Sequence, residues 1–585
     1  MKKHLFLFLT ILSLTGFGMA QDKTPTPTPT PTPKVDDTQN VKPENLQGVP
    51  PIAPKYQSDD KSLPDLGRVG VDMLEQKSLA LRDAIKLALE NNKDIEVSRQ
   101  NVKSAEFDLQ AADGFYEPKV SGSSYYERST TPNLSVFSSN QTTTNGSLVS
   151  NASFSGFFKK YGSTYSATIN NQRVTTNNPI SILSPQDNAS FNFTFNQPLF
   201  RGRGIDSQRR TIEIAKKNLS LTDTQFRQKS IDIIATTQRA YWDLTFALRN
   251  LQVQRDGIRD AKDQLAHNER LVKEGQLAQI DIVAAQTQVA NLELAVYDAL
   301  DTVNRAENVL KNLIAKDKND PLWSVSLIPT DKVDLDTPNT TLPEALDLAL
   351  QNRPELELND TAKEINQIDQ KFYKDQAKPQ VDLFASYTSS GVGGTTNPVF
   401  TNPLAGSVCS VPTSTQCQAF LAQQGNLLQN LGGSASTVSD IFAQKYPTLR
   451  VGVNFNFPLK NKTAEAQLGK SLVEEEKIQT QREQVEQVIQ VDVRNALQSL
   501  RTSEARLRAA AISRENSVKQ YESEQRKLDA GQSDIYKVLE RQTALMTARS
   551  AELRAQTELN KAIADLQRAT GNSLKANNVE ARLKK

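Results

Sequence analysis

The sequence predicts a mainly α-helical fold in which long antiparallel coiled-coil hairpins alternate with four short strands. Two strands are clear in "ASFNFTFNQPLF" (189–200) and "LRVGVNFNFPLK" (449–460), where apolar and polar residues alternate up to a proline. A long proline-free segment follows each of them, from Gly204 to Gly275 and from Pro458 to the end. Only 6% of the residues are aromatic and 23% are charged, which favours long solvated helices over a large apolar core.

The N-terminus has the pattern of a secretory signal peptide, residues 1–20. Lys2 and Lys3 precede a short apolar run, and Gly18-Met19-Ala20 provides a cleavage site without a following cysteine for a lipid anchor. Residues 21–78 begin with "TPTPTPTPTP" and predict a disordered Thr/Pro-rich spacer. No later run of about 18 apolar residues exists, so any membrane span must consist of strands.

The rest of the chain is an internal repeat. "LRDAIKLALENN" at Leu81 is echoed by "LPEALDLALQNR" at Leu342, and "RLVKEGQ" at Arg270 by "RKLDAGQ" at Arg526. We therefore expect a first repeat at 79–340, a second at 341–570 and a polar C-terminal tail at 571–585. Each repeat should contain a short helix, a longer helix, two strands and a long helical hairpin.

The hairpins are predicted to turn at Gly275 and Gly531. After Gly275, apolar residues recur every three or four positions from Ile282 to Leu313, and large residues alternate with alanine. This spacing is typical of a coiled-coil seam with closely packed backbones. The same pattern would also suit any soluble coiled-coil protein.

The strands add a second expectation, namely contact with lipid. Each is about ten residues long, as a tilted membrane-spanning strand requires. Four strands cannot close a barrel, and an open edge is not tolerated in lipid, so several copies must pool their strands. The alternative is a small soluble sheet, and residues 151–170 could form an extra hairpin in the first outer loop. The residues expected to face lipid are Phe191, Phe193, Phe195, Val453 and Phe455, and the strand-to-helix corners are Pro198 and Pro458.

The composition argues against enzymatic chemistry. After signal removal His267 is the only histidine, which disfavours imidazole catalysis and multi-histidine metal sites. We expect no cofactor, and a net charge of +2 gives no reason to expect nucleic acid. In an oxidising compartment, Cys409 and Cys417 could form a disulfide that stiffens a loop; otherwise they are free surface thiols.

The duplicated "L-x-x-A-(I/L)-x-L-A-L-x-N" openings, the strand-Pro-Leu corners and the turns after Gly275 and Gly531 resemble the outer-membrane efflux protein (TolC) family. That resemblance implies a homotrimer with four transmembrane strands per protomer, a twelve-stranded β-barrel in the outer membrane and an α-helical barrel through the periplasm. It also implies a passive exit duct for small molecules or polypeptides. Its partners would be a periplasmic adaptor and an inner-membrane pump or ABC transporter of an efflux or type I secretion system. The alternative is an exported structural coiled coil or an adaptor that does not conduct.

The resemblance also suggests a periplasmic gate just past the glycine turns. In the family, acidic residues six and nine positions after the second glycine form rings in the constriction. Here Lys537 and Glu540 occupy those positions, and Asp281 lies six residues after Gly275. Asp281 and Glu540 could form a selectivity ring, with Lys537 lowering its charge or pairing across subunits. Alternatively, all three are ordinary solvated helix charges.

Overall fold

The computed structural model describes residues 67–133, 141–402 and 404–579. The predicted signal peptide and most of the predicted spacer lie outside these residues. Within the described part of the chain, no helix is long and apolar enough to cross a membrane.

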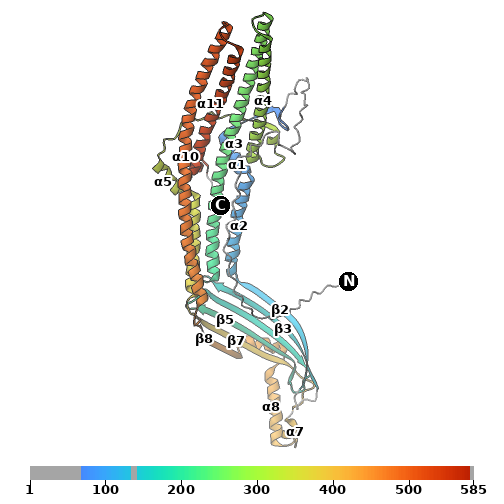
Figure 1. Cartoon of the computed structure of the whole chain (residues 1–585). Coiled ribbons are helices and arrows are strands. Elements are labelled where there is room, and N and C mark those ends of the chain that lie inside the picture. Colours follow the sequence, from blue (N-terminus) through green and yellow to red (C-terminus); the bar gives the residue numbers. More distant parts are fainter. Residues whose placement is uncertain (1–66, 134–140, 403, 580–585) are drawn as a thin grey trace, which may run out of the picture. The chain divides into compact units, whose positions relative to one another are not determined.

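Two similar sets of helices account for most of the structure (Figure 1). The long helix α3 contains 67 residues and α10 contains 68, or about 100 Å each at 1.5 Å per residue. No proline interrupts either helix, and the Asp206 side chain caps α3 by accepting from the backbone N–H of Arg209 at 2.8 Å. The first set is α1 (Leu81–Asn91), α2 (Lys93–Asp113), α3 (Ser207–Lys273) and α4 (Gln279–Ile314); the second is α5 (Leu342–Asn352), α6 (Pro354–Gln376), α10 (Lys462–Asp529) and α11 (Ile535–Ala569).

One antiparallel sheet of six strands connects the two sets, in the order β2-β3-β4-β5-β7-β8. The sheet thus has two strands more than the four expected, and residues 151–170, where an extra hairpin was considered, lie in these two strands and the turn between them. The two additional strands are β3 and β4, and they pair without interruption with their neighbours. The bounds are β2 (Lys119–Pro132), β3 (Thr142–Phe158), β4 (Ser163–Thr176), β5 (Leu183–Pro198), β7 (Gln380–Thr396) and β8 (Tyr446–Asn456).

A second, parallel pair of strands was not expected from the sequence. It consists of β1 (Asp72–Leu79) and β6 (Val325–Pro329). The predicted spacer to residue 78 therefore extends too far. Seven of the eight residues of β1 are exposed, so this strand depends on backbone pairing with β6 rather than on an apolar pattern of its own.

A buried ionic cluster holds the start of this segment. Arg68 contacts both Glu307 and Ser326, and Lys311 lies 3.2 Å from Glu307. Lys311 also donates to the backbone carbonyl of Trp323 at 3.0 Å. Burial lowers the pKa of the Lys311 ammonium. The cluster fastens residues 67–79 to α4, the 3-10 helix η3 (Pro321–Trp323) and β6.

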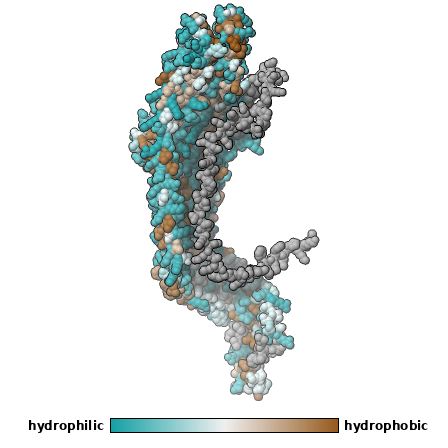
Figure 2. All heavy atoms as spheres, viewed as in Figure 1, coloured by the Kyte–Doolittle hydropathy of each residue, from teal (hydrophilic) through white to brown (hydrophobic). Residues whose placement is uncertain are grey.

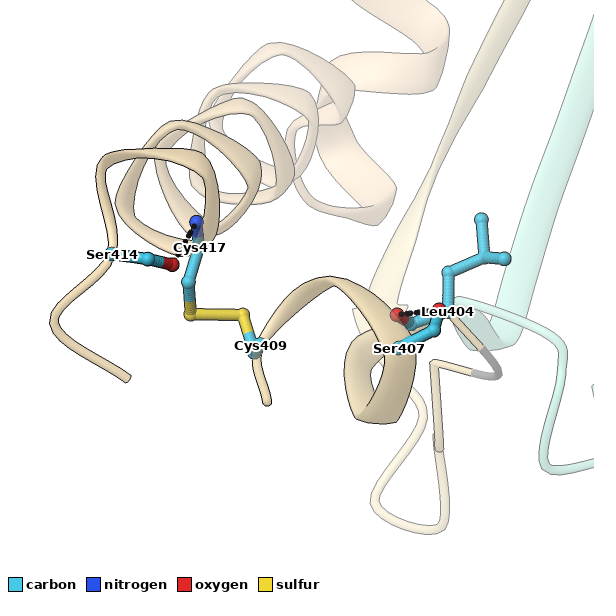
Figure 3. Close-up of a disulfide and its surroundings, with 5 residues drawn as sticks. All are labelled: Leu404, Ser407, Cys409, Ser414 and Cys417. Atoms are coloured by element: carbon cyan, nitrogen blue, oxygen red, sulfur yellow. Dashed lines mark hydrogen bonds between the residues drawn. A yellow bond between two sulfur atoms is a disulfide. The ribbon is translucent and has the colours of Figure 1, made fainter. Parts of the chain in front are cut away.

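Three short helices lie between β7 and β8: α7 (Ala405–Val408), α8 (Thr415–Leu431) and α9 (Ser434–Phe442). A disulfide joins Cys409 at the end of α7 to Cys417 in the first turn of α8 (Figure 3). Ser414 caps α8 by accepting from the backbone N–H of Cys417 at 3.2 Å. The bridge thus closes the loop between the two helices.

The apolar cores lie in the helical part. One core packs α1 against α3 and α4 around Tyr241, Leu244 and Val303, and the other packs α5 against α10 and α11 around Ile489 and Leu559. Much of the helix surface is hydrophilic on the face seen in Figure 2. The 3-10 helix η2 (Gly114–Tyr116) follows α2 directly. Near the C-terminus, the short helix α12 (Ser573–Ala576) contacts α3 and α11.

Candidate functional site

The six-stranded sheet has one apolar and one polar face. Residues directly opposite each other in antiparallel strands point to the same face. Phe193 lies opposite Ala167 and Tyr387, and Val453 lies opposite Leu383. The apolar face thus carries Val120, Tyr126, Leu148, Phe154, Tyr165, Ile169, Phe191, Phe193, Phe195, Leu383, Tyr387, Leu449, Val451, Val453 and Phe455.

The opposite face carries mostly hydroxyl and amide groups, with a few apolar residues such as Phe157 and Phe384. Thr194 lies opposite Ser166 and Ser386, and Asn192 lies opposite Thr168 and Thr388. The added strands continue this pattern, because their polar face carries Ser153, Asn151, Ser155, Thr168 and Asn170. The five residues expected to face lipid therefore share one face, and the two extra strands have the same polarity as the others.

The strand-to-helix corners lie where the sheet meets the long helices. β5 ends at Pro198, and the next residue, Leu199, donates its N–H to the carbonyl of Val381 at 2.8 Å. After Asn456, the last residue of β8, Pro458 precedes α10. Proline cannot donate a ladder hydrogen bond, so each strand ends where its helix can begin.

Both helical hairpins turn through the same hydrogen-bonded motif. Gly275 and Gly531 have φ of +75° and +70°. The N–H of Gln276 donates to the carbonyl of Leu271, and the N–H of Gln532 donates to that of Lys527. These bonds define a Schellman motif, in which glycine avoids the Cβ clash of the left-handed conformation.

The three residues expected to form a gate occupy different environments near these turns. The Asp281 carboxylate accepts from the backbone N–H of Ala278 at 3.1 Å and so caps α4. The Lys537 ammonium nitrogen lies 3.3 Å from a carboxylate oxygen of Asp534 in its own chain. The backbone N–H of Lys537 donates to the same carboxylate, and this hydrogen bond lowers the pKa of Asp534. Glu540 is exposed and has no hydrogen bond or ion pair within the described residues. The structure shows no contact that joins Asp281 to Glu540.

Polar side chains join the two hairpins, and the sequence did not predict these contacts. Gln288 of α4 donates to Thr543 of α11 at 3.0 Å, and Ser550 of α11 donates to Asn250 of α3 at 2.8 Å. These side chains line a groove between the hairpins, together with Phe246 and Arg554. Each hairpin therefore has an apolar seam, whereas the contacts between the two hairpins include amide and hydroxyl groups in this groove. Ion pairs between α3 and α11, such as Lys561 with Asp243 and Arg568 with Asp232, join them further along.

Solved outer-membrane channels have a similar fold. CmeC of Campylobacter jejuni matches with a TM-score of 0.56 and 15% identity, over 84% of this chain and 86% of that chain. The outer-membrane channel OprN matches with a TM-score of 0.57 and 14% identity, over 89% and 99%. MtrE of Neisseria gonorrhoeae, in its open state, matches with a TM-score of 0.54 and 15% identity, over 84% and 89%. The fold is that of outer-membrane channels.

The sequence comparison gives the family. The family model for outer membrane efflux proteins matches residues 161–316 and 424–572, which make up more than half of the 585 residues. The chain therefore belongs to the outer membrane efflux protein family, and the resemblance inferred from its repeats is confirmed. No curated protein matches the sequence.

Proposed function

We propose that the protein is a passive exit duct in the outer membrane, assembled from three copies. The observation that carries this proposal is the sheet, with its apolar face, its polar face and its two outer strands, β2 and β8. Unpaired backbone groups of an outer strand are too costly in lipid, so β2 of one copy must pair with β8 of the next. With six strands from each of three copies, the barrel has eighteen strands rather than the twelve expected.

The two faces of the sheet support a conduit. The Phe-rich face suits the acyl chains, and the Ser/Thr/Asn face suits a water-filled lumen. An eighteen-stranded barrel is wide enough to enclose an aqueous channel. A structural coiled coil or an adaptor would have no need for such a sheet.

The hairpin ends support docking of a periplasmic partner. Ile280 and Val283, just after the first turn, are 61% and 52% exposed, and Tyr536 after the second turn is 56% exposed. Exposed apolar side chains at the end of a long hairpin favour contact with another protein. The partner we propose is a periplasmic adaptor, which would connect the duct to an inner-membrane pump or ABC transporter.

The entrance would be a constriction lined by Glu540 and, less directly, by Asp281. Glu540 is exposed and free to face a lumen, whereas the carboxylate of Asp281 is partly engaged in capping α4. Lys537 pairs with Asp534 of its own chain, which argues against the suggested pairing across subunits. Three copies of Glu540 would concentrate negative charge in the pore and favour cations.

Mass and conductance together test this function. Light scattering of the detergent-extracted protein should give three times the mass of one chain, and planar-bilayer recordings should show a water-filled conductance. A monomer, or a trimer that inserts into bilayers without conducting, would reject the duct and favour a structural role.

A further inference from the structure

Helix α9 lies on the apolar face of the sheet, next to the aromatic residues. Ser389 of β7 donates to the carbonyl of Ile441 at 2.9 Å. A Cβ on Gly391 would lie 2.1 Å from the carbonyl oxygen of Thr437. Ser389 is opposite Phe191 in the sheet, so the side of β7 that contacts α9 is the side that carries Phe191, Phe193 and Phe195.

The sheet is shaped to receive this helix. Ser389, Gly391 and Gly393 are small residues that follow one another on this face, and they let the backbone of α9 approach closely. On the neighbouring strand, α9 shields Ala189 and Asp187, both of which are only 6% exposed. The helix therefore covers the part of this face where the aromatic residues end.

Helix α9 buries polar side chains and exposes apolar ones, which is the reverse of the pattern of a helix that faces water. Its buried residues include Thr437 and Asp440, at 1% and 8% exposure, whereas Val438 and Phe442 are 54% and 83% exposed. An amphipathic helix on a soluble protein buries its apolar stripe and exposes its polar one. Here the outward stripe is Ala435, Val438 and Phe442, at helical spacing.

The apolar stripe of α9 continues the lipid-facing surface of the sheet. On β7 that surface runs from Val381 to Tyr387, and on β8 from Phe455 to Leu449. The part of β7 that α9 contacts runs from Ser389 to Gly393. The helix thus extends the apolar surface by four residues, or about 13 Å along the strand at 3.3 Å per residue. α6 leads into β7 at Gln380, and α9 contacts the opposite end of this strand. In the proposed barrel, that opposite end lies toward the outer surface of the cell.

We propose that α9 is a lipid-contact helix that seats Val438 and Phe442 in the outer leaflet, at the boundary between acyl chains and headgroups. An interfacial helix of this kind buries its apolar side into that boundary. It would replace the Ser and Gly surface of β7 with apolar side chains and so complete the lipid-facing band. This inference rests on the proposed barrel, because it takes the apolar face of the sheet to be the lipid face.

Site-directed spin labelling of the full chain in bilayers tests it. One nitroxide is placed at Phe442→Cys, with Phe455→Cys as the reference in the sheet and Gln423→Cys, exposed on α8, as the reference in water. The protein has only two cysteines, and the structure pairs them, so the unmodified chain should take up no label. The readout is the ratio of collisions with lipid-soluble oxygen to collisions with a water-soluble nickel chelate.

We expect the ratio at Phe442 to be several-fold above that at Gln423 and close to that at Phe455. A ratio at Phe442 equal to that at Gln423, with Phe455 still in lipid, would overturn the inference and leave the proposed duct intact. A water-like ratio at Phe455 would instead reject the lipid face itself, and both proposals with it.

A second variant tests whether docking on the sheet positions the helix. Gly391→Ala places a Cβ against the backbone of Thr437, whereas a Cβ on Gly425 of α8 would meet nothing within 4 Å. Gly391→Ala should lower the collision ratio of the label at Phe442 toward the value in water, and Gly425→Ala should not. Equal ratios in the two variants would contradict the docking of α9 on this face.

Discussion

Phe193 and Thr194 are adjacent residues of β5 whose side chains lie on opposite faces of the sheet. Phe193 is 41% exposed and sits between Ala167 and Tyr387 on the apolar face. Thr194 sits between Ser166 and Ser386 on the polar face. At the residue scale, this alternation would allow one strand of the proposed barrel to contact both lipid and water.

Phe193→Arg should therefore destabilise the barrel by about 2–4 kcal/mol if this position lies near the bilayer midplane. Thr194→Arg, which would face the lumen, should be milder. The measurement is the amount of heat-stable oligomer extracted from outer membranes. If both variants assemble equally well, the assignment of the lipid face is wrong.

Tyr241 of α3 is a buried residue that the sequence did not single out. Its hydroxyl lies 2.6 Å from a carboxylate oxygen of Asp331 and accepts from the backbone N–H groups of Thr330 and Asp331 at 3.1 Å. Burial raises the pKa of Tyr241, so the hydroxyl stays protonated and can donate at any physiological pH.

Tyr241→Phe leaves the backbone N–H of Asp331 without its partner, whereas that of Thr330 still donates to the carbonyl of Leu79 at 3.2 Å. We expect the free energy of unfolding to fall by about 1–3 kcal/mol. Tyr536→Phe is the matched control, because Tyr536 is 56% exposed and its hydroxyl can bond to water. Thermal unfolding followed by circular dichroism should show a lower midpoint for Tyr241→Phe alone. Equal midpoints would mean that water replaces the lost hydroxyl.

At the scale of elements, a Gly→Ala substitution should have opposite effects at two positions of the second hairpin, Gly531 and Gly469. Neither Gly531 nor Gly469 would place an added Cβ within 4 Å of another group, so contacts do not distinguish them. They differ in backbone conformation, because Gly531 has φ of +70° at the turn and Gly469 is inside α10.

Gly531→Ala should destabilise the hairpin end by about 1–2 kcal/mol, since alanine resists the left-handed conformation. Gly469→Ala should instead stabilise α10 by about 0.5–1 kcal/mol, because alanine is the better helix former. Hydrogen exchange of the hairpin amides measures both changes. The same sign for both substitutions would contradict the role given to the turn.

The disulfide acts on the segment between β7 and β8. Mass spectrometry under non-reducing conditions should find Cys409 linked to Cys417 in the exported protein. Cys409→Ser should leave conductance unchanged, because the bridge joins α7 to α8 and touches none of the long helices. Quantitative alkylation of both thiols without reductant would show that the bridge does not form.

At the scale of the whole molecule, the proposed function depends on how the hairpins of three copies would meet. Within one copy, the two hairpins are joined by hydrogen bonds such as Gln288 to Thr543 and by ion pairs such as Arg568 to Asp232. Each such hydrogen bond contributes only about 1 kcal/mol net. In the proposed duct, hydrogen bonds of this strength would allow the hairpins to separate at the entrance.

The charge of that entrance can be measured as ion selectivity. Planar-bilayer recordings should show a preference for cations that weakens in Glu540→Gln and weakens further when Asp281→Asn is added. Glu515→Gln is the control, because Glu515 pairs with Lys519 on α10 at a distance of 2.7 Å. Unchanged reversal potentials in the double variant would place the constriction elsewhere.

The sequence by itself determined the features that depend on local residues. Prolines end β5 and β8, Gly275 and Gly531 permit the turns, and uninterrupted helix formers give α3 and α10 their length. The alternation of Phe and Asn also defined the two faces of β5 before its neighbours were known. These signals are local, because each depends on backbone freedom or on a short periodic pattern.

Only the tertiary structure decided which segments pair. β3 and β4 are rich in Ser, Thr and Asn, and their strand character comes from backbone bonds to β2 and β5. β1 likewise exists because β6, some 250 residues later, pairs with it. Arg68 contacts Glu307, which is 239 residues further along the chain. The position of α9 depends on two glycines of β7 that look like ordinary loop residues in the sequence. The contacts of β1 with β6 and of Arg68 with Glu307 join parts of the chain that are far apart in the sequence, so no local pattern of residues can predict them.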